Sequence, residues 1–133
     1  MFVDASAVVA IITEEPGHAE LLRCLDEAEE PITSGLAVFE TVMALARKKG
    51  LPIADARAEI EAFIGIVGLR IVPIAEIETT FALAAHARYG KGRHPARLNL
   101  GDSFAYACAK VHGVPLLFVG DDFPQTDIEP ALA

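Results

Sequence analysis

The stretch MFVDASAVVAIIT, residues 1–13, combines a strand pattern and a helix pattern that together indicate the fold class. Its first part, Met1–Asp4, is a short apolar run that ends in a carboxylate. Ser6 can then cap a helix that continues to about Thr13, because Ala7–Ile12 is wholly apolar. A buried strand followed at once by a buried helix is typical of an α/β protein.

The same alternation of strand and helix continues along the chain. Near-continuous apolar strands separated by helices favour a parallel sheet that is covered on both faces. We therefore expect one α/β domain over residues 1–133, with no internal repeat or linker. The expected helices are 18–28, 36–49, 52–66, 76–89 and 100–112, and the expected strands are 31–34, 70–74 and 115–119, with a final edge strand beginning at Ile128.

Composition limits the class of protein. With 53% hydrophobic and 23% charged residues, the 133-residue chain is expected to fold around its own core without a disulfide or a structural metal. Cys24 and Cys108 are interpreted as small core residues in a reducing compartment. Asp4 interrupts the apolar start, which has no basic leader, and no stretch is long enough to span a bilayer. We therefore expect a cytoplasmic protein.

The charge is unevenly distributed. A net charge of −8 argues, taken alone, against a nucleic-acid partner. Residues 14–30 carry seven acids against Arg23, which is typical of a solvated helix face. Between residues 80 and 120 the balance reverses, and Asp102 is the one acid among five cations: Arg88, Lys91, Arg93, Arg97 and Lys110. The overall charge therefore hides a local basic segment.

Acidic side chains follow the ends of the predicted strands. In an open parallel sheet, ligands bind outside the carboxyl ends of the strands. Asp4 closes the first strand, and Asp121 and Asp122 follow the last clear one. Asp102 opens a helix at the same edge, and Glu40 lies one to two turns into the helix that follows the second strand. We expect these carboxylates to converge.

Each acid also has a structural explanation, as a turn residue, a helix cap or an ordinary loop carboxylate. Glu40 is the hardest to explain in this way, because its helix is apolar and Arg47 lies beyond the useful i,i+4 range. Converging carboxylates would repel one another, and a divalent cation removes that repulsion. Hard oxygen ligands suit Mg²⁺ or Mn²⁺, and such a site activates water for attack on a phosphodiester.

Four blocks of sequence, in order, resemble the PIN-domain family and, within it, the VapC toxins of bacterial toxin–antitoxin pairs. One block alone would be a weak signal, whereas all four at these separations are specific. They are MFVDASA at 1–7, AVFET at 37–41, HPARLNLGDS at 94–103, and LLFVGDDF at 116–123 followed by TDI at 126–128.

The resemblance implies a sheet of order 3-2-1-4-5 and Mg²⁺-dependent hydrolysis of RNA, with Mn²⁺ as an alternative. It implies Asp4 and Asp102 as the acids tied most directly to the metal, and Glu40 as the third acid. Asp122 matches the fourth acid because it precedes Phe123, while Asp121 can assist through water. Ser6 and Ser103 match small polar positions that position water or substrate.

The resemblance also implies partners: a VapB-like antitoxin, an RNA substrate, a homodimer and a larger assembly with the antitoxin, but no membrane. We expect RNA contacts from the basic loop, through Arg88, Lys91, Arg93 and Arg97, with Tyr89 stacking on a base. The hypothesis for the reaction is that Asp4, Asp102 and Asp122 hold one or two ions and that Glu40 orients water. Cleavage would leave 5′-phosphate and 3′-hydroxyl ends.

Three alternatives stay open. A structure-specific DNA nuclease of the same family would use the same pocket, although it usually carries insertions for which this chain has little room. A phosphotransfer domain needs either a second Asp where Ser6 stands or a Lys where the last strand ends at Gly120. A catalytically silent module that binds metal or RNA would keep the acids without the activity.

Overall fold

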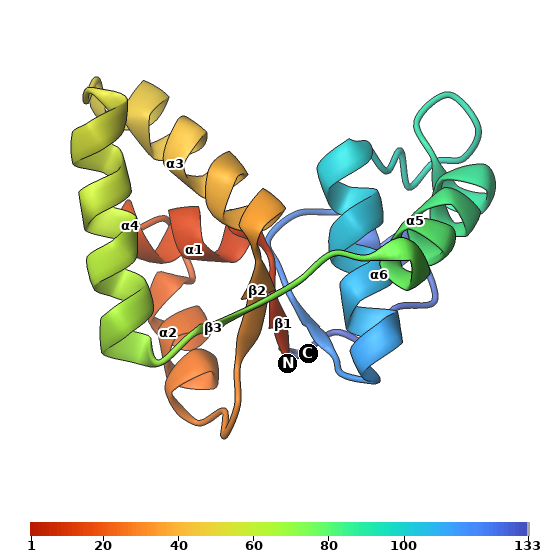
Figure 1. The fold of residues 1–133 in the computed structure, drawn as a ribbon, viewed down its shortest axis with the longest axis horizontal. Coiled ribbons are helices and arrows are strands. Elements are labelled where there is room, and N and C mark those ends of the chain that lie inside the picture. The colour runs from red at the N-terminus through yellow and green to blue at the C-terminus, as the bar shows by residue number, and fades with distance from the viewer. Residues whose placement is uncertain (133) are drawn as a thin grey trace.

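The chain forms a parallel sheet between two layers of helices, and the computed structural model describes residues 1–132 of it. Figure 1 shows the sheet edge-on, with α1–α4 on one side and α5 and α6 on the other. The elements are β1 (Phe2–Val3), α1 (Ala5–Ile12), α2 (His18–Asp26), β2 (Ile32–Ser34), α3 (Gly35–Lys49), α4 (Ile53–Val67), β3 (Arg70–Val72), α5 (Glu76–Tyr89), α6 (Leu100–His112), β4 (Leu116–Leu117) and the short 3-10 helix Phe123–Gln125.

The sheet confirms the predicted parallel architecture but has fewer strands than expected. Its order is β3-β2-β1-β4, and every neighbouring pair is parallel. The expected fifth strand at Ile128 is wrong: the segment forms a single bridge between Leu116 and Pro130. The Leu116 N–H donates to Glu129 and its carbonyl accepts from Ala131. Pro130 has no N–H to continue the ladder.

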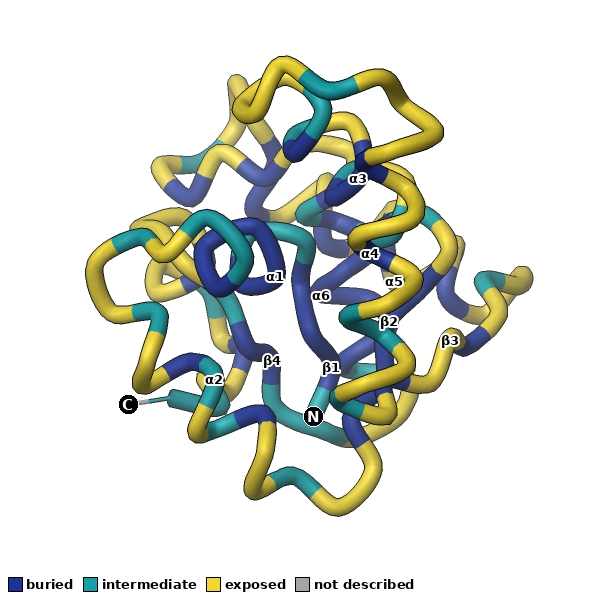
Figure 2. Tube along the Cα trace, turned by 90° about the vertical axis from the view of Figure 1, so that its left-hand side faces the viewer, coloured by how far each residue is buried: buried dark blue, intermediate teal, exposed yellow. Residues whose placement is uncertain are grey.

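Alternating side chains of the strands face two separate cores. Phe2 and Leu116 pack into the core under α5 and α6, whereas Val3 and Leu117 pack into the core under α1–α4. All four are fully buried. Figure 2 shows β1, β4 and most of α1 as buried, which explains why these segments are almost wholly apolar.

Helix ends follow the capping residues in the sequence. The Ser34 side chain accepts a hydrogen bond from the N–H of Ala37 at the start of α3, and Gly50 ends that helix in a left-handed conformation. At the first helix the prediction is corrected: Asp4 is the N-cap in place of Ser6. The Asp4 carboxylate accepts the N–H of Ser6, so α1 begins at Ala5, two residues earlier than a Ser6 cap would allow.

Both cysteines of the chain, Cys24 and Cys108, are free thiols. Cys108 is buried, and Cys24 is partly buried with its Sγ 3.6 Å from the carbonyl oxygen of Ala131. Burial raises the pKa of the Cys108 thiol to about 11, so this side chain stays a neutral core residue. Over residues 1–132, no helix has the length and apolar character needed to cross a membrane.

Candidate metal centre

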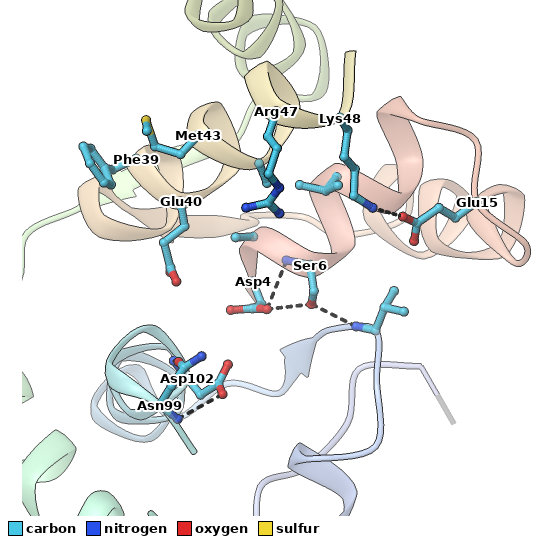
Figure 3. Close-up of a pocket in the computed structure, with 14 residues that line it drawn as sticks. Asp4, Ser6, Glu15, Phe39, Glu40, Met43, Arg47, Lys48, Asn99 and Asp102 are labelled. Carbon is cyan, nitrogen blue, oxygen red and sulfur yellow. Dashed lines mark hydrogen bonds and ion pairs between the residues drawn. The ribbon is translucent and has the colours of Figure 1, made fainter. Parts of the chain in front are cut away.

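Three of the predicted acids line one pocket of about 560 Å³. Asp4 comes from the end of β1, Glu40 from the second turn of α3, and Asp102 from the first turn of α6. Figure 3 shows the Glu40 side chain pointing from α3 toward the gap between Asp4 and Asp102. The pocket therefore lies at the carboxyl edge of the sheet, where the two helical layers meet.

Asp4 is held in place by Ser6. Its Oδ2 accepts the Ser6 N–H at 3.1 Å and the Ser6 hydroxyl at 2.6 Å. The same hydroxyl oxygen accepts the backbone N–H of Val119 at 3.0 Å, and the Asp4 N–H donates to the carbonyl of Leu117 at 2.9 Å. These bonds fix a buried carboxylate between β1 and the loop that follows β4.

Asp102 combines a structural role with a place in the pocket. Asn99 caps α6 by accepting the N–H of Asp102 at 2.9 Å, and Asp102 Oδ2 accepts the N–H of Asn99 at 3.2 Å. This reciprocal pair is a capping box. Within residues 1–132, Asp102 Oδ1 has no hydrogen-bond donor, so this second oxygen remains available for a cation.

Glu40 approaches the other two acids because Gly101 leaves room for it. The Glu40 carboxylate lies against the Cα of Gly101, where a Cβ atom would overlap both carboxylate oxygens. Because Gly101 directly precedes Asp102, this contact brings the α3 carboxylate to the first turn of α6. The glycine therefore sets how closely the two helical layers can bring their acids together.

The three carboxyl groups have raised pKa values. Burial is the main cause in each case, and it raises the pKa of Glu40 to about 7 and that of Asp102 to about 6. Repulsion from Asp4 adds to both shifts, and Asp102 adds to that of Glu40. Burial also raises the pKa of Asp4, against the hydrogen bonds from Ser6. No cation contributes to any of these shifts.

This environment fits a divalent cation. Oxygen donors from three carboxylates are the ligands that Mg²⁺ and Mn²⁺ prefer, and a bound cation would relieve the repulsion that now raises the pKa values. In residues 1–132, no three His, Cys, Asp or Glu side chains lie closely enough to hold an ion as they stand. An ion that binds here therefore has to draw the carboxylates inward or contact some of them through water.

The two acids after β4 differ in their relation to the pocket. Neither Asp121 nor Asp122 lines it, and both are exposed. The charge of Asp122 nevertheless reaches Asp102 and raises its pKa, whereas Asp121 contributes to no such shift. Of the two, Asp122 is thus the one placed near the other acids.

Two other sets of predicted residues lie outside the acidic pocket. Ser103 donates to the carbonyl of Asn99 and lines a second pocket between α5 and α6. Arg88 lies over the ring of Tyr89, 4.8 Å from its centroid, and its Nη1 is 3.9 Å from Asp127. Lys91, Arg93 and Arg97 are exposed in the loop between α5 and α6. Tyr89 is buried, so the prediction that it stacks on a base is wrong.

Several residues that line the pocket were not predicted from the sequence. Arg47 and Lys48 line its wall on α3, and Asn99 and Glu15 line other parts. Arg47 stands seven residues after Glu40, which is close to two helical turns. Residues at this spacing lie on the same face of a helix, so the sequence could have placed Arg47 beside the pocket. Asn99 was recognisable as a cap before a helix. No sequence signal places Glu15 there.

A family model and individual relatives point to the same protein family. A family model described as PIN domain matches residues 1–129. A VapC ribonuclease from Rhizobium meliloti is 43% identical to the chain, with 96% of this chain and 98% of the relative covered. Ribonuclease VapC36 of Mycobacterium tuberculosis is 42% identical, with coverage of 97% and 91%.

Solved structures share the fold at low sequence identity. The crystal structure of Mycobacterium tuberculosis VapC20, described as a toxin that cleaves the sarcin–ricin loop, superposes with a TM-score of 0.72 at 18% identity. It covers 97% of this chain and 98% of its own. A toxin–antitoxin complex from Klebsiella pneumoniae gives a TM-score of 0.69 at 15% identity, with coverage of 95% and 92%. At 18% and 15% sequence identity, these two similarities show a shared fold and nothing further.

Proposed function

The chain belongs to the PIN domain family and, within it, to the VapC ribonucleases, and on this premise we propose that it hydrolyses RNA phosphodiesters with a divalent metal held in the acidic pocket. The observation that carries the proposal is the meeting of Asp4, Glu40 and Asp102 from three separate elements in one pocket. Burial is the main cause of their raised pKa values, and repulsion between the acids adds to those of Glu40 and Asp102, which supports a site that receives a cation.

Asp4 and Asp102 would hold Mg²⁺, or Mn²⁺ in its place. Each has one oxygen fixed by hydrogen bonds, which orients the carboxylate before an ion arrives. Asp122 would supply the fourth acid, because its charge already reaches Asp102, and Asp121 would act only through water. Ser6 positions Asp4 through its hydroxyl and lines the same pocket, where it would help to position water or substrate.

When bound, the divalent ion supplies the Lewis-acid charge that activates water and stabilises the leaving 3′ oxygen. Glu40 is the side chain placed to orient the attacking water and accept its proton, because it points from α3 toward the gap between Asp4 and Asp102. The bond that forms joins the water oxygen to phosphorus, and the bond that breaks joins phosphorus to the 3′ oxygen, which then takes up a proton. The products carry 5′-phosphate and 3′-hydroxyl ends.

Substitution of the acids tests this assignment. Asp4→Asn and Asp102→Asn should each lower RNA cleavage in Mg²⁺ by at least about 100-fold, since changes to outer-shell partners alone cost 10–100-fold. Asp26→Asn is the matched control, because Asp26 is exposed at the end of α2 and lies outside the pocket. Wild-type cleavage by either pocket variant would refute its role, and cleavage that survives EDTA would refute the metal. Branched DNA as a parallel substrate tests the alternative nuclease.

The family relation also supports a protein inhibitor. We infer that the chain is the toxin of a pair whose antitoxin, a VapB-like protein, blocks the acidic pocket, and that the toxin forms a homodimer and a larger assembly with the antitoxin in the cytoplasm. The net charge of −8 favours a basic inhibitor. Co-expression with the product of the neighbouring gene, followed by purification and light scattering, tests the pairing and the assembly size. A chain that is harmless when expressed alone and captures no partner would refute the inference.

A further inference from the structure

One wall of the acidic pocket consists of two adjacent rows of side chains on α3. The first row is Phe39, Met43 and Arg47, and the second is Glu40, Ala44 and Lys48. Residues four apart lie one above the other on a helix, so each row runs along the axis and the rows lie side by side. The wall therefore begins with an acid beside an aromatic ring and ends with two cations. We call the first row the α3 ridge.

Among residues 1–132, no carboxylate forms an ion pair with Arg47. Lys48 is paired with Glu15, Nζ to Oε1 at 2.6 Å, and Lys49 is paired with Glu59 at 3.1 Å. Arg47 forms no ion pair within residues 1–132, although Figure 3 shows its guanidinium pointing into the pocket above Asp4. Arg47 also contributes nothing to the pKa shift of any pocket carboxyl.

The other end of the ridge exposes apolar surface beside the acids. The Phe39 side chain is 63% exposed and that of Met43 is 41% exposed, although both line the pocket. An exposed ring next to a carboxylate that is placed for phosphodiester chemistry offers a flat apolar face where a nucleobase would arrive. Aromatic rings that are free on one face are what single-stranded nucleic acids stack on, together with cations that follow the backbone.

From this arrangement we propose that the α3 ridge is a binding track for single-stranded RNA, with a base on Phe39 and Met43 and a backbone phosphate on Arg47. The proposal rests on the proposed ribonuclease function and adds a substrate subsite to it. Glu40 and Arg47 are seven residues apart, about 10 Å along the helix axis, so Arg47 would contact a phosphate of the strand other than the one attacked beside Glu40. Arginine suits the distal phosphate because its guanidinium donates two parallel hydrogen bonds to phosphate oxygens.

A binding measurement without turnover tests the track. In EDTA, the affinity of an unstructured, fluorescently labelled single-stranded RNA is measured by anisotropy between about 50 and 200 mM salt. Arg47→Gln should weaken binding and lower the slope of log K against log salt by about 0.7, the value expected for one lost phosphate contact on a single strand. Lys49→Gln is the matched control, because it removes the same charge from the same end of α3 but lies outside the pocket. It should leave the slope unchanged.

A second pair of variants tests the apolar end of the α3 ridge. Phe39→Ala should weaken RNA binding about 5-fold or more while leaving the salt slope unchanged, because a stacking contact releases no counterion. Ile66→Ala is the control, since Ile66 is 84% exposed on α4 and lies outside the pocket. In Mg²⁺, both ridge variants should raise KM with little change in kcat, because neither residue belongs to the acid cluster.

The outcomes separate this proposal from the ribonuclease function. If the wild-type chain cleaves RNA in Mg²⁺ but Arg47→Gln matches Lys49→Gln in affinity and slope, the track is refuted and the ribonuclease function stands. If the ridge variants keep RNA binding but lose capture of the antitoxin, the ridge is a protein-docking surface and the RNA proposal is overturned. If the wild-type chain neither binds nor cleaves RNA, both proposals fail.

Discussion

Gly101→Ala tests whether one missing methyl group allows the acidic pocket to form. A Cβ atom at this position would lie nearer than 3.0 Å to both Glu40 carboxylate oxygens, a distance that real Cβ atoms essentially never show. The Glu40 side chain is flexible and half-buried, so it can swing away while the backbone stays in place. The substitution should therefore displace a carboxylate without unfolding the protein.

The expected effects on stability and on metal affinity differ in size. Alanine is favoured over glycine within a helix by up to about 1 kcal/mol. Moving Glu40 off its preferred rotamer costs about 0.5–1.5 kcal/mol, so the two terms nearly cancel and Tm should change by only a few degrees. The loss of a correctly placed acid should lower Mg²⁺ or Mn²⁺ affinity by about 10- to 100-fold.

Calorimetric titration of Mn²⁺ measures this loss, with thermal unfolding as the stability readout. Gly65→Ala, in α4, is the matched control, because a Cβ atom there meets nothing within 4 Å. In a Glu40→Ala background, Gly101→Ala should lower the affinity no further, since the displaced side chain is already gone. Wild-type affinity in Gly101→Ala, or an equal loss in the Glu40→Ala background, would refute the reasoning.

Two further predictions concern the acidic pocket, and a third concerns a hydrogen bond outside it. Ser6→Ala should lower metal affinity by about 10-fold, because the hydroxyl that orients Asp4 is lost; a metal titration measures it, and unchanged affinity would contradict it. In EDTA the free energy of unfolding should fall as the pH rises from about 4 to about 7. Over this range the raised pKa values of Glu40 and Asp102 let the folded chain bind more protons than the unfolded chain. Glu40→Gln should therefore raise Tm at pH 8 in EDTA, and a lower Tm would refute that sign. Tyr106→Phe should cost about 1.5 kcal/mol in urea unfolding, because it removes the 2.5 Å hydrogen bond to Asp127, and should spare RNA cleavage.

Helices were predictable where capping residues and apolar spacing agreed. The predicted ranges 76–89 and 100–112 match α5 and α6. The start of α1 was ambiguous, because Asp4 and Ser6 are both good caps and only the folded backbone shows which oxygen receives the N–H. Strand number depended on one residue, since Pro130 limits the last segment to a single bridge.

The acids of the candidate site were predictable from their positions at the ends of strands. Burial of a carboxylate alone would have pointed to a residue outside the site. Glu78 is 5% exposed, more buried than Glu40, and its Oε2 accepts the N–H of Ala75 at the start of α5. It serves a helix end and does not line the acidic pocket. What distinguishes Glu40 is its position one to two turns from the sheet edge where Asp4 ends β1. The i,i+4 rule excludes Arg47 as a neighbour of Glu40, although two full turns also return to the same face of the helix.

The bonds that fix Asp4 join distant parts of the chain, and this controls when a cleavage centre can exist. Ser6 and Val119 are 113 residues apart, and β1 is paired with β4 as well as with β2. A growing chain on the ribosome cannot close these contacts until β4 has emerged. At about 5–20 residues per second, that delay is on the order of ten seconds after the Asp4 codon is read. Until β4 has emerged, Asp4 therefore lacks the contacts with Leu117 and, through Ser6, with Val119 that hold it in the pocket.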